Sequence, residues 1–331
     1  MRTLPLIPLL LVLSLAAGCG TSGSSDGAGG AGGEAGAGGA GGDGGSGGSG
    51  GSGGEGGSGG SGGVGERTVA EVCRIWREGH VENEKVPWIA GDDPCDPGIF
   101  SDVAVEDTLR RINMFRELAG LPPVTEDPAQ RHQDQACAVV MNANNALSHT
   151  PPKSWQCWSE AAYDGANSSN LALGYRTPGN AIDGLMGDGG VPSQGHRRWL
   201  LGFYLGKVGL GFAGRATCVG VFDGSNPTDV PWTAYPQPGP APIDMVTDSH
   251  DPIAWSFHPA DGIAGAEVKM QRLPFLDEVA IESWIPNTGF RIPDAIAWQP
   301  PAVRAGESYR ITITRPAKET ITYDVKLVDC N

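Results

Sequence analysis

The apolar residues in the middle of the chain recur three or four positions apart, which is typical of amphipathic helices. One such stripe predicts a helix over residues 105–119 and consists of Val105, Leu109, Ile112, Phe115 and Leu118. A second helix is predicted to follow Asp127 as N-cap and Pro128 as first helical residue, because both favour these positions. Shorter helices are expected from Asn180 and after Ser193.

After these helices the pattern changes to strict alternation, which indicates β-strands. Val208, Leu210 and Phe212 would share one face of a strand over residues 207–213, and a second strand is expected over 217–222. Helices followed by a hairpin predict an α+β or α/β/α layered domain over residues 104–222.

The C-terminal part contains short β-like runs separated by turn residues. We interpret residues 223–250, which are rich in Pro, Gly and Asp, as a connector and residues 251–331 as a small all-β, Ig-like sandwich. The alternative is that these strands extend the sheet of the preceding domain. The predicted strands are 253–257, 266–273, 279–285, 295–298, 309–314 and 321–328.

The first 66 residues resemble an export signal and a spacer. Residues 4–17 are almost wholly apolar but too few to span a bilayer, so residues 1–19 are predicted to be a lipoprotein signal peptide that ends in the lipobox cysteine Cys19. Ala16 stands where leucine is usual, so an ordinary secretory leader is the alternative. Residues 20–66 are nearly all Gly, Ser and Ala and are expected to form a disordered tether.

Without Cys19 the chain has six cysteines, an even number that suits disulfides in an oxidising compartment. Six cysteines allow fifteen pairings, and short separations favour Cys73–Cys95 and Cys137–Cys157, which leaves Cys218–Cys330. The first of these would staple residues 67–103, which otherwise look irregular apart from a short helix at 69–76.

The formal net charge of −15 excludes nucleic acid as an expected partner, because phosphate backbones require clustered Lys and Arg. It also disfavours electrostatic adhesion to anionic lipid, so attachment to a membrane would depend on acyl chains on Cys19. We therefore expect an exported protein that is anchored to the bacterial cell envelope and faces outward.

Five short motifs stand in order along the central region, and together they resemble the CAP superfamily of cysteine-rich secretory proteins, antigen 5 and pathogenesis-related 1 proteins, also called SCP. The motifs span about residues 104–222. They are residues 109–116 with 119–124, residues 147–150, residues 168–172 in place of "GENLA", residues 181–186, and residues 195–201 followed by 207–212.

The resemblance implies an α-β-α sandwich with a cleft that holds two histidines and two acidic residues. Carried over by position, the histidines are His149 and His196, and one acidic residue is Asp188. The other acidic position is occupied by Ser169, so the set is incomplete. Many members of the family hold a divalent cation, so His149, His196 and Asp188 are candidate zinc ligands. The missing carboxylate should weaken such a site.

Two classes of function stand at this point. The first is a non-enzymatic module that binds an extracellular lipid, glycan or protein. The second is a metal-assisted or Ser-dependent hydrolase or peptidase at the cell surface. Catalytic residues stay unassigned because the sequence has no GxSxG, HExxH or P-loop motif. The remaining histidines, His80, His132, His250 and His258, have no motif around them and are expected to be solvated.

Overall fold

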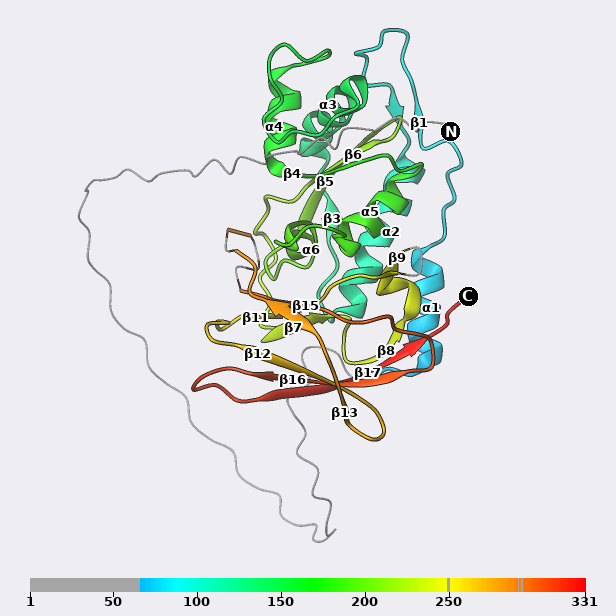
Figure 1. Cartoon of the computed structure of the whole chain (residues 1–331). Coiled ribbons are helices and arrows are strands. Elements are labelled where there is room, and N and C mark those ends of the chain that lie inside the picture. Colours follow the sequence, from blue (N-terminus) through cyan, green and yellow to red (C-terminus); the bar gives the residue numbers. More distant parts are fainter. Residues whose placement is uncertain (1–65, 249–250, 288, 291, 293) are drawn as a thin grey trace, which may run out of the picture. The chain divides into compact units, whose positions relative to one another are not determined.

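The computed structural model describes residues 66–248, 251–287, 289–290, 292 and 294–331. The predicted leader, Cys19 and the tether lie outside the described residues. The described part combines helices with antiparallel-rich sheets, which confirms the predicted α+β class (Figure 1). None of the helices in that part is both long and apolar enough to cross a membrane.

A four-stranded sheet in the order β3-β5-β6-β4 forms the middle layer of the first domain (Figure 1). Helices α3 and α4 pack against one face of this sheet, and helices α2 and α5 lie on the other face. The strands are β3 (Thr125–Glu126), β4 (Ser169–Leu173), β5 (Lys207–Ala213) and β6 (Ala216–Gly220). The helices are α2 (Asp102–Leu118), α3 (Pro128–Asn144), α4 (Glu160–Ser168), α5 (Pro178–Gly187) and α6 (Gly195–Leu200).

Strand β5 shows why the two faces of this sheet differ. Val208, Leu210 and Phe212 point into the larger core, as their alternation predicted. The opposite face presents Gly209 and Gly211, where a Cβ atom would overlap the backbone or carboxyl of an aspartate on α3. The glycines therefore let α3 approach the sheet closely, and the disulfide Cys137–Cys218 joins the two.

The predicted helices are confirmed, with small shifts at their ends. Asp127 caps α3 and Pro128 is its first residue. Helix α4 was not predicted, because its sequence, EAAYDGANS, has only a short apolar side. It buries Ala162, Gly165 and Ala166 against α3, and Gly165 comes so close to the α3 backbone that a side chain would not fit.

The C-terminal strands form two further sheets, in the orders β14-β15-β11-β7 and β13-β12-β16-β17-β8, which we call the β domain. The structure therefore contradicts the alternative that these strands extend the sheet of the first domain. Aromatic contacts join the two sheets: the rings of Trp255 and Tyr309 are 5.9 Å apart and those of Trp232 and Tyr323 are 5.6 Å apart. The strands are β11 (Trp255–Pro259), β12 (Glu267–Arg272), β13 (Asp277–Val279), β14 (Glu282–Trp284), β15 (Ile296–Gln299), β16 (Ser308–Thr314) and β17 (Ile321–Val328).

Residues 223–250, which we predicted to be a connector, include two strands of the β domain. They are β7 (Trp232–Tyr235) and β8 (Gly239–Pro242), and β8 pairs in parallel with β17 at the edge of its sheet. Proline is tolerated on edge strands, so the Pro-rich composition concealed a strand rather than marking a linker. The short helix η1 (Ile243–Met245) and the pair β9 (Thr247–Asp248) and β10 (Asp251–Pro252) follow.

The N-terminal segment is more regular than predicted. It contains helix α1 (Val69–Gly79), which begins with a capping box of Thr68 and Glu71, and a pair of short strands, β1 (Trp88–Ile89) and β2 (Ile99–Phe100). Helix α1 packs against α2 and β8 (Figure 1).

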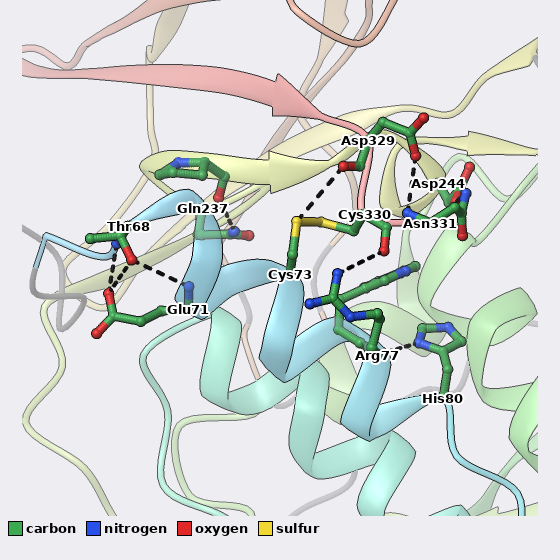
Figure 2. Close-up of a disulfide and its surroundings, with 12 residues drawn as sticks. Thr68, Glu71, Cys73, Arg77, His80, Gln237, Asp244, Asp329, Cys330 and Asn331 are labelled. Atoms are coloured by element: carbon green, nitrogen blue, oxygen red, sulfur yellow. Dashed lines mark hydrogen bonds between the residues drawn. A yellow bond between two sulfur atoms is a disulfide. The ribbon is translucent and has the colours of Figure 1, made fainter.

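The favoured disulfide pairing is wrong at every bond. The structure pairs Cys73 with Cys330, Cys95 with Cys157, and Cys137 with Cys218. Figure 2 shows the first of these bonds, which ties α1 to the end of β17, with Arg77 donating a hydrogen bond to the carbonyl of Cys330. Separation in sequence misled the prediction because the sheet and helix packing brings distant cysteines together.

Buried arginines join the first domain to the β domain. Arg197 is fully buried and donates to the carbonyl of Ala254 at 2.9 Å and to Ser256 Oγ at 2.8 Å, while its guanidinium lies 4.0 Å from the centre of the Tyr235 ring. The next residue, Arg198, donates to the carbonyls of Asn287 and Ile292. Because a buried cation without acceptors would be very costly, these bonds fix α6 against the β domain.

Candidate functional site

A cavity of about 630 Å³ lies where the first domain meets α1, residues 244–248 and Ile253. This size is within the usual range for small-molecule pockets. Its walls are largely apolar and aromatic, and they include Trp76, Phe115, Leu171, Leu185, Tyr175, Tyr235, Met245 and Ile253. The ionisable groups that line it, apart from the tyrosines, are His80, Asp183, Asp188, His196, Asp244 and Asp248.

His196 and Asp188 form a tight pair in this cavity. Asp188 follows α5 in a left-handed conformation with φ of 53°, which Asp tolerates better than most residues. Its Oδ1 is 2.7 Å from His196 Nδ1, and its Oδ2 accepts the backbone N–H of Arg197. The Asp188 side chain is 0 % exposed, whereas that of His196 is 27 % exposed. Since a carboxylate only accepts, His196 Nδ1 carries a proton and Nε2 is left for a ligand.

Ser169 is not among the described residues that line this cavity. Its hydroxyl is buried and donates to Asp134 Oδ1 at 2.9 Å, on the face of the sheet that α3 covers. Burial raises the pKa of Asp134 to about 7, although the Ser169 hydrogen bond opposes this shift. The structure thus separates Ser169 from the His196–Asp188 pair and does not assemble a Ser–His–Asp triad from them.

His149 is exposed and donates through Nδ1 to the carbonyl of Ala166 at 2.9 Å. Leu147, two residues earlier, lines the cavity, but His149 is not among its described lining residues. His149 bonds with Ala166, whereas His196 and Asp188 bond with each other in the cavity, so the structure does not bring the three predicted zinc ligands together. Among the described residues, no three His, Cys, Asp or Glu side chains are grouped so that they could hold a metal ion.

Sequence reasoning missed the second histidine of the cavity. His80 follows α1 directly and is 29 % exposed, and its ring packs against Trp76 with centroids 4.1 Å apart and the planes tilted by 43°. His258 is fully buried in the β domain, so the expectation that these two histidines are solvated is wrong. The usable signal for His80 was its spacing of four residues from Trp76 on an amphipathic helix. Asp183, on α5, faces His80 across 3.7 Å between Oδ1 and Nε2.

The α-β-α layers and the paired histidine and aspartate define a layered α+β domain with a cavity of small-molecule size. Residues 109–221 match the model of the CAP family, described as the cysteine-rich secretory protein family, and the chain therefore contains a CAP domain. A comparison with curated proteins finds no matching relative. The match ends before the β domain and does not include α1, so the cavity uses residues from inside and outside the CAP domain.

Proposed function

We propose that the protein is a cell-surface CAP lipoprotein that binds a small extracellular ligand without chemical turnover. The cavity of about 630 Å³ carries this proposal, because the CAP residues His196 and Asp188 line it together with apolar residues of α1, Met245 and Ile253. Pockets with mostly apolar walls and a few convergent polar groups are typical of small-molecule sites.

Several features support an extracellular location. The three disulfides suit an oxidising compartment. The apolar residues 4–17 before Cys19 suit export and lipid attachment, and the Gly-rich residues 20–66 suit a flexible spacer. Mass spectrometry of the protein from its membrane fraction tests the anchor: we expect diacylglyceryl-modified Cys19 at the new N-terminus, and an unmodified Cys19 would contradict it.

A second candidate function is hydrolysis with His196 as general base. The observation that favours it is the Asp188 contact, because a buried carboxylate that orients an imidazole is a common arrangement in catalysis. Turnover of model esters or peptides that is lost in His196→Gln would establish this function. Ligand binding without any such turnover would leave the first proposal standing.

A library screen on the purified full chain tests ligand binding directly. The matched variants are Gly187→Phe and Thr322→Phe. A Cβ at Gly187 meets Ile253 at 3.7 Å, so the new ring would grow into the cavity that both residues line. Thr322 is exposed on β17 and serves as the control. We expect ligands that raise the Tm of the wild type and of Thr322→Phe but not of Gly187→Phe. A diverse library that yields no such ligand would overturn the proposal.

A further inference from the structure

His80 and Asp183 present two acceptors toward each other in the cavity. The carbonyl of Trp76 lies 2.7 Å from His80 Nδ1, so this nitrogen carries the proton and Nε2 is an acceptor in the neutral ring. Burial and the charge of Arg111 lower the pKa of His80, which favours that neutral ring. Asp183 Oδ1 lies 3.7 Å from Nε2 and accepts no hydrogen bond from the described residues. Buried acceptors without donors are rare, so a donor from a ligand would be stabilised here.

The charges around this pair favour a cation as that donor. Arg111 donates a hydrogen bond to Asp183 Oδ2 and lies 3.8 Å from Glu82, so the single positive charge of Arg111 is shared between two carboxylates. Asp244 and Asp248 add further acidic groups to the lining, and none of the described lining residues is Lys or Arg. Burial raises the pKa of Asp183 although the charge of Arg111 opposes this shift, so a further cation nearby would favour the charged carboxylate.

The apolar walls nearby indicate what the cation carries. Trp76 packs against His80 in a tilted arrangement, and Phe115 packs edge-to-face on Trp76 with ring centroids 5.9 Å apart. Tyr175 and Leu185 line the same cavity. Aromatic faces attract organic cations in addition to burying apolar surface.

We propose that the cavity binds an organic amine whose ammonium group donates to Asp183 Oδ1 and His80 Nε2 while its apolar body lies against Trp76. The two acceptor atoms are 3.7 Å apart, so the nitrogen of one ammonium group can lie within hydrogen-bond distance of both. The inference rests on the proposed ligand-binding function and adds a ligand class to it. It also assigns a binding role to His80, which lies outside the residues matched by the CAP family.

Isothermal titration of the full chain with three indole compounds tests this assignment. Tryptamine, tryptophol and indole-3-propionate share one ring and differ in carrying an ammonium, a hydroxyl or a carboxylate. We expect tryptamine to bind at least tenfold more tightly than tryptophol, because a charge-assisted bond is about twice as strong as a neutral one, and indole-3-propionate to bind more weakly than both. Asp183→Asn and His80→Gln should each weaken tryptamine at least tenfold and leave tryptophol within threefold.

Asp324→Asn is the matched control, because Asp324 is also paired with an arginine and its side chain is 45 % exposed, but it lies on β17. Circular dichroism checks that every variant is folded. Equal binding of tryptamine and tryptophol, unchanged tryptamine binding in both cavity variants, or no binding of tryptamine would each overturn the amine assignment. If tryptophol or indole-3-propionate binds at least as tightly as tryptamine, and Gly187→Phe abolishes that binding, the amine assignment is overturned but the proposed function is kept. The proposed ligand binding is tested separately, by the library screen, and only a negative result there would overturn it.

Discussion

The cavity contains two histidine–aspartate pairs that are built in opposite ways. In the first pair, Asp188 is fully buried, both of its oxygens accept hydrogen bonds, and His196 lies 2.7 Å away. In the second pair, Asp183 is partly exposed, its Oδ1 accepts nothing from the described residues, and His80 lies 3.7 Å away. The first pair is complete within the protein, whereas the second pair is completed by a donor from outside.

The difference separates two uses of a carboxylate near a ligand. Asp188 holds an imidazole in one orientation and therefore acts as a positioning residue for His196. Asp183 has an acceptor to spare and therefore acts as a binding group. The two pairs also differ in origin, because His196 and Asp188 both lie in the CAP match, whereas His80 comes from α1, before that match.

Removal of the Cys73–Cys330 disulfide should have the largest effect on stability. It should disturb the His80–Asp183 pair but not the His196–Asp188 pair. The bond holds α1, which positions His80, to the end of β17 (Figure 2). We expect the double variant Cys73→Ser/Cys330→Ser to lose about 3–5 kcal/mol of unfolding free energy, because the bond closes a long loop. Tryptamine binding should weaken, while the NMR signal of His196 stays in place.

The variant Cys95→Ser/Cys157→Ser is the control for this experiment. Its bond joins the exposed Cys95 to Cys157. Cys157 lies on the opposite side of the first domain's sheet from α2 and α5. Neither cysteine is among the described residues that line the cavity. It should lose stability without weakening tryptamine. Equal loss of tryptamine binding in both double variants would show that the Cys73–Cys330 bond does not support binding by holding α1 in place.

Asp188→Ala should cost about 3 kcal/mol of unfolding free energy. It leaves His196 Nδ1 and the N–H of Arg197 without an acceptor, at about 1–3 kcal/mol for each buried group. Alanine also tolerates the φ of 53° less well than aspartate. Urea unfolding measures the loss. Asp188→Asn keeps an acceptor and suits this backbone, so it should lose less than half as much; equal losses would show that the hydrogen bonds are not the cause.

Asp134 is a third buried carboxyl, and among the described residues only the Ser169 hydroxyl donates a hydrogen bond to its side chain. Burial raises its folded-state pKa to about 7 from an ordinary value near 4, so the native state holds the proton more tightly than the unfolded chain. The stability that this proton gives is present in acid and is lost as pH rises toward 7. Asp134→Asn, which cannot ionise, should therefore be more stabilising at pH 8 than at pH 4.5 by about 3 kcal/mol, because each unit of pKa shift corresponds to about 1.4 kcal/mol.

Urea unfolding at both pH values checks this sign, with Ser169→Ala as a companion variant. That variant removes the Ser169 hydrogen bond, which favours the charged form of Asp134, and should make the pH dependence steeper. A gain from Asp134→Asn that is the same at pH 4.5 and pH 8 would contradict the raised pKa.

Sequence reasoning found the parts of the fold and site that local signals specify. Asp127 and Pro128 marked the start of α3, and the alternation at Val208, Leu210 and Phe212 marked β5. The CAP motifs led to His196 and Asp188, which the structure does bring together. These features depend on residues that are close in sequence or on a family pattern.

The parts that were missed depend on contacts between distant segments. Cys73 meets Cys330 because α1 packs against β8, which pairs with the C-terminal strand β17, and neither spacing nor composition records that packing. His80 reaches the cavity for the same reason. Ser169 occupies the position of a cleft residue in the motif but points toward Asp134, because side chains alternate along β4 and the α3 face needs a donor for a buried carboxyl.

Asp183→Asn should have the smallest effect on stability, a loss of unfolding free energy below about 1 kcal/mol. Asp188→Ala should lose about 3 kcal/mol. Arg111 keeps its bond to the Gly79 carbonyl and its contact with Glu82 when the Asp183 charge is removed. Burial raises the pKa of Asp183, so loss of its charge also removes a desolvation cost that offsets the lost ion pair. Urea unfolding at pH 7 should show nearly equal free energies for wild type and variant, and a loss as large as that of Asp188→Ala would mean that Asp183 is a structural residue. If stability is retained while tryptamine binding falls at least tenfold, the two aspartates of one cavity have distinct roles, because one positions a histidine and the other binds the ligand.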